Sequence, residues 1–277
     1  MTGTAFVGTS GWRYPRWRGD FYPRGLVQRR ELEYIAERLP SVELNGSFYS
    51  LQRPESYQRW RAEVPEDFVF AVKGSRYVTH MLRLRNAHVG LANFFASGVL
   101  ALGPTLGPLL WQLPERIEFD PGILDDFLAT LPRTTGAALT LARDHDVRLD
   151  GRAWLDIEDD RPLRHALEPR SPSFADPRVA DILRAHDVAL VLADTAGRWP
   201  AFDAVTAHHV YVRLHGSTEL YASGYTDEEL DVWADRVRRW QSGAGGDGMP
   251  RDVYVYFDND ARGRAPHDAV ALDARLR

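Results

Sequence analysis

The sequence predicts a single-domain α/β protein, a (β/α)8 TIM barrel that spans residues 1–277. Short apolar runs alternate with helix-like segments eight times along the chain. The length of 277 residues is typical of this barrel and is ample for one hydrophobic core. A doubly wound open sheet is the alternative. It usually has fewer repeats and a Gly-x-Gly-x-x-Gly turn after its first strand, where this chain has GTSGW.

Eight apolar segments are expected to form the strands of the barrel. In chain order they are AFVGTS, SVELNGSFY, DFVFAVKGS, GPLLWQLP, HALEPR, VALVLADT, VYVRLHG and DVYVYFDND. The alternation in VYVRLHG places Tyr211, Arg213 and His215 on one face of its strand. A barrel has no sheet edges, so this polar face is expected to point inward.

Seven of the eight strands are followed by a segment with helical spacing of apolar residues. These expected helices are residues 29–39, 54–64, 89–102, 121–131, 176–186, 226–241 and 265–276. Thr226 and Glu229 match a capping box at the start of the sixth of them. Residues 133–165 interrupt the rhythm between the fourth helix and the fifth strand. We expect them to form an extra helix and loop on the N-terminal face of the barrel, which is the face that usually contributes stability.

The composition excludes several classes of protein. The formal net charge of −5 argues against a general nucleic-acid or membrane surface. The absence of cysteine excludes disulfides, thiolate nucleophiles and zinc–thiolate sites. The N-terminal residues do not resemble a signal peptide, and no apolar run reaches the ~18 residues of a membrane span. We therefore expect a cytoplasmic location and no membrane partner.

Polar side chains occur at the C-terminal ends of all eight predicted strands, where the active site of a TIM barrel lies. Glu43 and Asn45 are two residues apart, which predicts that they share one strand face. Aromatic and histidine residues in the following loops are expected to complete the site. The candidate residues are Ser10, Trp12, Tyr14, Trp17, Glu43, Asn45, Tyr49, Lys73, His80, Gln112, Glu168, Arg170, Asp194, Arg213, His215 and Asn259.

The chemistry of this set indicates an enzyme that acts on a small anionic substrate by general acid–base catalysis. Cationic side chains bind phosphate or carboxylate groups, and the candidates for this role are Lys73, Arg170 and Arg213. The catalytic candidates are Glu168, His215, Asp194 and Glu43, and the other residues of the set are expected to bind substrate. The alternative is that these residues have purely structural roles. The carboxylates would neutralise the arginines in a buried network, the aromatic residues would pack the loops, and His80 would cap a helix.

Two further functions use other subsets of the same residues. No cofactor is predicted, but Glu168, Asp194 and His215 would suit a divalent cation in a metal-dependent hydrolase or isomerase. The third hypothesis is a non-catalytic protein that binds nucleotides or single-stranded nucleic acid. The bases of the bound nucleic acid would stack on aromatic residues of the loop 12–22, and its phosphates would contact Arg13, Arg16 and Arg18.

Motifs along nearly the whole chain resemble the YecE-like family, which is catalogued as domain of unknown function 72. They are GTSGWRYPRWRGDFYP, VELNGSFY, FAVKGSRYVTH, LGPLLWQLP, YVRLHG with YASGYT, and VYVYFDND. The resemblance implies a TIM-type barrel, and it supplies no settled reaction or catalytic residue. Ser171 stands where the family typically has a histidine, so any chemistry of that histidine would be missing from this chain.

Overall fold

The computed structural model describes residues 2–244 and 247–277. Its strands are β1 (Ala5–Ser10), β2 (Ser41–Leu44), β3 (Val69–Lys73), β4 (Leu106–Gln112), β5 (His165–Glu168), β6 (Val188–Leu190), β7 (Leu192–Asp194), β8 (His209–Leu214) and β9 (Asp252–Phe257). They form one sheet in the order β6-β5-β4-β3-β2-β1-β9-β8-β7. Strands that follow one another in sequence are therefore neighbours, except β6 and β7 at the two ends of the order. The first strand pairs in parallel with the last, Ala5 beside Val253. This order confirms the prediction of an α/β barrel.

The helices confirm most of the predicted strand–helix alternation. They are α1 (Glu31–Ala36), α2 (Gly46–Tyr49), α3 (Pro54–Ala62), α4 (His88–Ala96), α5 (Pro121–Thr130), α6 (Thr135–Ala142), α7 (Pro177–Ala185), α8 (Asp227–Ser242) and α9 (Ala265–Leu276). The helix α6 is the extra helix expected within residues 133–165. The capping box of α8 is also present, because Thr226 Oγ1 accepts from the Glu229 amide and the Glu229 carboxylate accepts from the Thr226 amide.

Three predicted elements differ from the structure. The expected strand SVELNGSFY ends at Leu44, and the chain then turns into the short helix α2. The expected strand VALVLADT is divided into β6 and β7. The helix expected over residues 89–102 ends at Ala96, because Gly98 adopts a left-handed φ of 114° and a separate 3-10 segment, Val99–Thr105, follows it.

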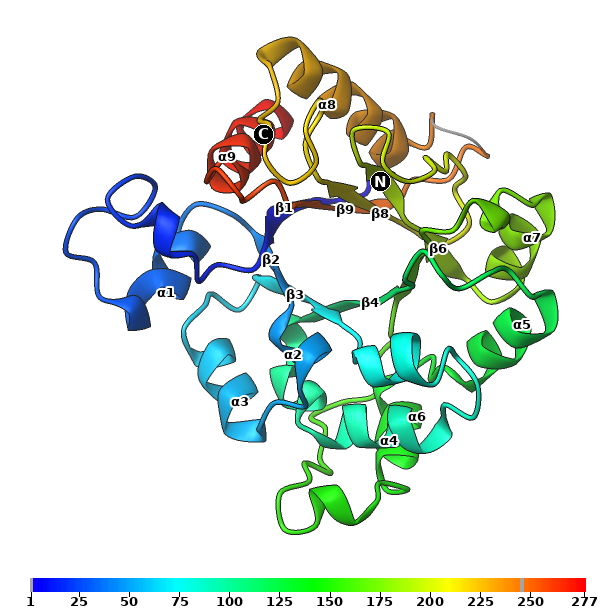
Figure 1. Cartoon of the computed structure of the whole chain (residues 1–277). Helices are drawn as coiled ribbons and strands as arrows, with labels where there is room; N and C mark the ends of the chain where they lie inside the picture. Colours follow the sequence, from blue (N-terminus) through cyan, green and yellow to red (C-terminus); the bar gives the residue numbers. More distant parts are fainter. Residues whose placement is uncertain (1, 245–246) are drawn as a thin grey trace. The chain divides into compact units, whose positions relative to one another are not determined.

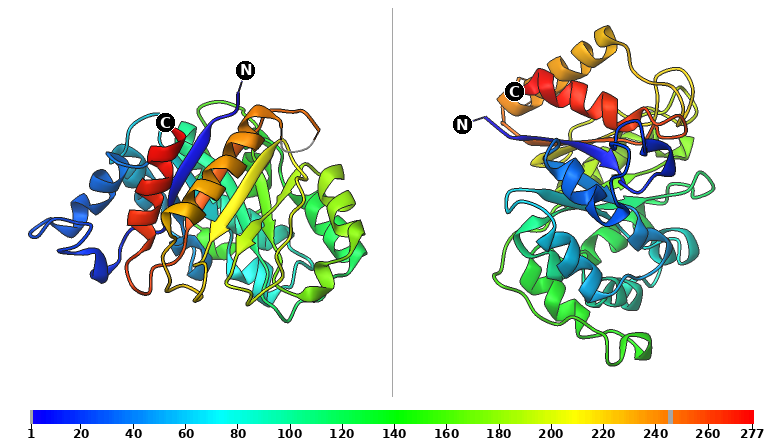
Figure 2. Two further views of the ribbon diagram at one scale, coloured as in Figure 1. Left: turned by 90° about the horizontal axis from the view of Figure 1, so that it is seen from above. Right: turned by 90° about the vertical axis from the view of Figure 1, so that its left-hand side faces the viewer.

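The chain divides into two compact units. The first comprises the residues up to Glu43 together with Ala189–Arg277, and the second is Leu44–Val188. In the first unit α8 and α9 lie next to each other and pack on β9 and β1 (Figures 1 and 2). In the second unit α4 packs on α6, and α5 packs on α7 (Figure 1). Within the described ranges of the chain, none of the helices has both the length and the apolar character that crossing a bilayer requires.

Candidate functional site

Glu43, at the end of β2, is the centre of a buried polar network in the first unit. Its carboxylate accepts hydrogen bonds from Ser10 Oγ and from the Tyr211 hydroxyl, each at 2.7 Å. It also accepts from Nε and Nη2 of Arg213, at 3.0 and 2.8 Å. Tyr211 and Arg213 thus share the inward face of β8, as the alternation predicts. Both carboxylate oxygens of Glu43 are engaged by donors of the protein itself.

Arg213 is held by a second carboxylate as well. Its Nη2 donates to Asp258 Oδ2 at 3.1 Å, and the Arg213 side chain is only 1% exposed. His215 is fully buried beside it, with Nδ1 at 3.1 Å from Asp258 Oδ2. We refer to Ser10, Glu43, Tyr211, Arg213 and Asp258 as the Arg213 network. Because two carboxylates compensate this guanidinium, the network has the contacts of a structural ion-pair cluster.

Asp194 and Asn259 lie on other hydrogen bonds of the first unit. Asp194 accepts a hydrogen bond from the Tyr225 hydroxyl at 3.1 Å, and burial raises the pKa of its carboxyl group. The Asn259 side-chain amide is buried and donates to the Ser223 carbonyl at 2.9 Å and to Asp268 Oδ2 at 2.7 Å. The contacts of Asn259 therefore join the loop that carries Ser223 to α9.

The aromatic residues after β1 are packed into the protein. Trp17 is fully buried, and its indole N–H donates to Asp260. Trp12 is only 6% exposed, and the Tyr14 hydroxyl donates to the Ser10 carbonyl. Burial, followed by the charge of Asp258, raises the pKa of the Tyr14 hydroxyl above its usual range. These rings have little free face on which a nucleic-acid base could stack.

A second group of polar residues lies in the second unit, around His80. This residue is in a π-helical turn, Tyr77–Met81, that follows β3. Burial lowers the pKa of His80 to about 4, and the positive charges of Lys73, Arg116, Arg170 and Arg76 add to the effect in that order. We refer to these five residues as the His80 cluster. The imidazole is neutral at pH 7, because burial first and then the surrounding positive charges disfavour its protonated form.

Contacts with neighbouring side chains hold the members of the His80 cluster in place. Nδ1 of His80 is 2.9 Å from the Thr79 hydroxyl, and the ring lies edge-on to Phe48 at 5.0 Å. The ammonium group of Lys73 lies 4.4 Å from the centroid of the same Phe48 ring. The Arg116 guanidinium donates to the His80 carbonyl at 3.3 Å. Phe48 is thus an apolar wall that His80 and Lys73 share.

Glu168 and Arg170 form an ion pair beside Gln112. Nη2 of Arg170 is 2.9 Å from Oε1 of Glu168, and Nε donates to the same oxygen at 3.0 Å. Gln112 and Glu168 are register partners on β4 and β5, and the Gln112 amide donates to the Leu113 carbonyl at 2.7 Å. Because Arg170 also acts on the pKa of His80, this ion pair belongs to the surroundings of the His80 cluster.

Two predicted site residues, Asn45 and Tyr49, lie at the ends of the short helix α2 and not on the strand that the sequence pattern predicts. Asn45 was expected on the same strand face as Glu43, and this expectation is wrong because β2 ends at Leu44 and Asn45 is the N-cap of α2. Tyr49, at the other end of α2, is 67% exposed. Arg76 and Arg116 were missed. They follow the ends of β3 and β4 by three and four residues, and that position is the signal that could have found them.

The candidate residues fall into two sets, one in each unit. The first unit holds Ser10, Trp12, Tyr14, Trp17, Glu43, Asp194, Arg213, His215 and Asn259, and the second holds Asn45, Tyr49, Lys73, His80, Gln112, Glu168 and Arg170. Asp194 and His215 of the alternative metal set are therefore in one unit and Glu168 in the other. Over residues 2–244 and 247–277, no group of three or more His, Cys, Asp or Glu side chains is arranged to hold a metal ion.

Comparisons with known proteins identify relatives along the whole chain. Residues 6–277 match the model of DUF72, a protein family of unknown function. The UPF0759 protein YecE of Escherichia coli K12 is 25% identical over 241 residues, which are 85% of this chain and 81% of the relative. The UPF0759 protein YunF of Bacillus subtilis is 32% identical over 77 residues, which are 27% of this chain and 25% of YunF.

Solved structures of the same family share the fold. A DUF72 protein of Thermotoga maritima superposes with a TM-score of 0.76 at 23% identity, over 99% of both chains. A DUF72 protein of Enterococcus faecalis gives a TM-score of 0.70 at 17% identity, over 99% of this chain and 95% of the other. At these identities the likeness establishes the fold and does not identify a reaction.

Proposed function

This chain belongs to the DUF72 family of proteins of unknown function, and we propose that it is an enzyme that uses general acid–base catalysis on a small anionic substrate bound at the His80 cluster. One observation carries the proposal. Four cationic side chains, those of Lys73, Arg76, Arg116 and Arg170, act together on a single half-buried imidazole. The whole chain carries a net charge of −5, so this group of four cations is a local region of opposite sign. A local positive potential attracts anions, which suggests an anionic ligand.

The cations of the cluster differ in how far they are already compensated. Arg170 forms an ion pair with Glu168, whereas Arg76 and Arg116 make no ion pair with any carboxylate of the described residues. Planar guanidinium groups bind phosphate and carboxylate oxygens through paired N–H donors. A phosphorylated or carboxylated sugar-like molecule is the substrate class that this charge and polarity suit.

His80 is the residue that we assign to proton transfer at this site. Its pKa of about 4 leaves the imidazole neutral at pH 7, with one ring nitrogen able to accept a proton. A bound dianion would stabilise the protonated form and raise the pKa of His80 toward the working pH. Glu168 remains the second candidate for proton transfer. Arg213 has no role in this proposal, because Glu43 and Asp258 already bind it.

An NMR titration of the histidine side chains tests the proposal directly. The pKa of His80 is measured in the free protein and again with saturating inorganic phosphate. We expect a free value near 4 and an increase of about one unit or more when phosphate binds beside the ring. In the variant Arg170→Met the free pKa of His80 should rise, because one of the charges that depress it is removed.

Controls separate a bound anion from general screening by salt. Sodium chloride at the same ionic strength should leave the increase much smaller. The His88 side chain on α4 is exposed and lies 2.8 Å from Asp144, so its ring chemical shifts at fixed pH should change equally in both salts. A His80 pKa that phosphate and chloride change to the same extent would refute the anion site.

A further inference from the structure

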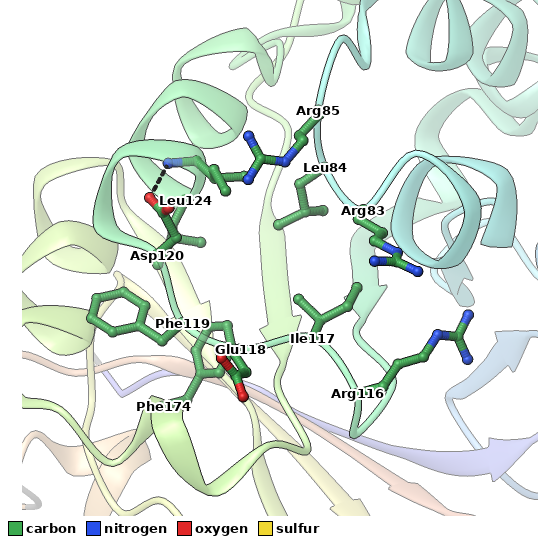
Figure 3. A pocket seen from close by; sticks show the side chains of 11 residues that line it. Arg83, Leu84, Arg85, Arg116, Ile117, Glu118, Phe119, Asp120, Leu124 and Phe174 are labelled. Atoms are coloured by element: carbon green, nitrogen blue, oxygen red, sulfur yellow. Dashed lines mark hydrogen bonds between the residues drawn. The ribbon is translucent and has the colours of Figure 1, made fainter.

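A pocket of about 360 Å³ lies in the second unit, beside the segment that follows the π-helical turn (Figure 3). It is distinct from the candidate set, because none of the sixteen residues selected from the sequence lines it. Its main lining residues are Arg83, Leu84, Arg85, Arg116, Ile117 and Phe174. Glu118, Phe119 and Asp120 continue the wall toward α5.

Three arginines without ion-pair partners line this pocket. Arg83, Arg85 and Arg116 are exposed, and no carboxylate among the described residues forms an ion pair with them. Guanidinium groups bind phosphate and carboxylate oxygens through paired N–H donors, so three of them without a carboxylate partner on one concave surface indicate a site for an anion. Of the two acidic residues in the wall, Asp120 already accepts from the Ile123 amide at 3.0 Å as the N-cap of α5.

The rest of the pocket is apolar. Leu84, Ile117 and Leu124 are buried, and the rings of Phe119 and Phe174 lie 5.4 Å apart. In Figure 3 Arg83 and Arg116 lie at one end, the two phenylalanines lie at the other, and Leu84 and Ile117 lie between them. Two of the three arginines thus lie at the end away from the phenylalanines, Arg85 extends toward Leu124 and Asp120, and an aliphatic floor joins the two ends. A free inorganic anion would use only the arginine side chains.

The backbone of the arginine segment is held in an unusual conformation. Arg83 and Leu84 have φ values of 53° and 68°, in the left-handed region that non-glycine residues rarely adopt. The amide of Leu84 nevertheless donates to the Val78 carbonyl at 3.1 Å, and its side chain is only 5% exposed. This conformation buries Leu84 while Arg83 and Arg85 on either side remain exposed. Such strained backbone is characteristic of ligand sites.

We propose that this pocket binds a phosphomonoester of an aromatic alcohol. The phosphate would lie between the guanidinium groups of Arg83 and Arg116, and the ring would extend over Leu84 and Ile117 toward the phenylalanines. Glu118 favours this orientation, because it lines the wall directly before Phe119 and its carboxylate would repel a phosphate there. The inference goes beyond the proposed function and does not depend on it, although Arg116 belongs to both the pocket and the His80 cluster.

Calorimetric titration of the full chain with phenyl phosphate tests this assignment. We expect phenyl phosphate to bind about tenfold more tightly than inorganic phosphate, since only the ester contacts the apolar floor. Arg83→Ala should weaken phenyl phosphate binding by about tenfold or more, the loss of one charge-assisted contact. Phe119→Ala should weaken the ester and leave inorganic phosphate unchanged. The matched control is Arg29→Ala, which removes an exposed, unpaired arginine of the first unit and should change neither affinity.

The outcomes separate this inference from the proposed function. Equal affinity of the protein for the ester and for inorganic phosphate would overturn the pocket assignment, and so would an Arg83→Ala variant with unchanged affinity for the ester. In either case the response of the His80 pKa to phosphate would still decide the proposed function. Conversely, ester binding that requires Arg83 and Phe119 would support the pocket even if phosphate leaves the His80 pKa unchanged. A circular dichroism spectrum identical to that of the wild type confirms that each variant is folded.

Discussion

Single residues show which of the buried charges are structural. Glu43 is fully buried and accepts four hydrogen bonds from three side chains. The substitution Glu43→Gln would remove the charge and leave Arg213 buried with one carboxylate partner in place of two. Breaking a buried ion pair in this way costs about 3–5 kcal/mol, so we expect a loss of this size in the free energy of unfolding, measured with urea.

The matched control is Glu33→Gln, because the Glu33 side chain is 47% exposed and, among the residues that the structure describes, forms an ion pair with the exposed Arg30 alone. Surface pairs of this kind contribute about 0–1 kcal/mol, so that variant should unfold almost as the wild type does. If Glu43→Gln were as stable as the control, the structural role of the Arg213 network would be wrong. The catalytic role predicted for Glu43 would then regain support.

Asp260 is the residue whose titration should be visible in the stability of the protein. Burial, and then the charge of Asp258, raise its pKa from 3.8 to about 6. A carboxyl group with a higher pKa in the folded chain holds its proton more tightly there, so folding favours the protonated form. The free energy of unfolding should therefore contain a contribution that is present below about pH 4 and is lost as the pH rises to about 6.

The variant Asp260→Asn isolates this contribution, because its amide oxygen can still accept from the Trp17 indole. We expect the difference in stability between variant and wild type to grow in favour of the variant from about pH 4 to about pH 6. Urea denaturation at several pH values across this range measures the difference. A difference independent of pH would contradict the elevated pKa.

At the scale of residues, sequence reasoning identified which side chains are polar at strand ends but not what they bind. Tyr211 and Arg213 could be placed on one face because a strand has a fixed period of two. Their hydrogen bonds to Glu43 depend on how strands distant in sequence are arranged, and the alternation of residues along one strand does not predict that arrangement. His80 was a candidate, but the charges of Arg76 and Arg116 that surround it come from loops without a regular period.

At the scale of elements, helix starts with side-chain caps were the most predictable features. The capping box at α8 was visible in the sequence, because Thr226 and Glu229 have the spacing that lets each side chain reach the backbone of the other. Thr226→Ala should lower the free energy of unfolding by about 1 kcal/mol, the usual cost of losing an N-cap. Thermal or urea unfolding measures the loss, and Thr2→Ala, at an exposed position near the chain start, is the control. An unchanged stability of Thr226→Ala would show that tertiary packing alone fixes the start of α8.

Elements shaped by backbone conformation were the least predictable. The residues after Leu44 have the apolar and aromatic composition of a strand, yet they form α2. The π-helical turn at Tyr77–Met81 and the left-handed residues Arg83 and Leu84 leave no signature in the pattern of apolar residues. Both His80 and the arginine pocket depend on this segment. The part of the chain with the most functional interest is therefore the part that periodicity describes least well.

At the scale of the whole molecule, eight-fold alternation was sufficient to predict the barrel, because each parallel strand needs a helix to cover its outer face and neighbouring strands to pair its edges. The same topology makes the two compact units unequal in folding. The second unit, Leu44–Val188, is one continuous stretch of chain. The first unit contains the pairing of β1 with β9, which requires Ala5 to contact Val253 near the other end of the sequence.

This difference predicts the order in which the units gain structure. Closing a longer loop costs more conformational entropy, and contacts distant in sequence form more slowly. We therefore expect backbone amides of β4 and β5 to become protected from hydrogen exchange before those of β1, β8 and β9. Pulse-labelling exchange with mass spectrometry during refolding from urea measures the order. Protection that develops first, or simultaneously, in β1 and β9 would show that pairing of the first and last strands belongs to the folding nucleus.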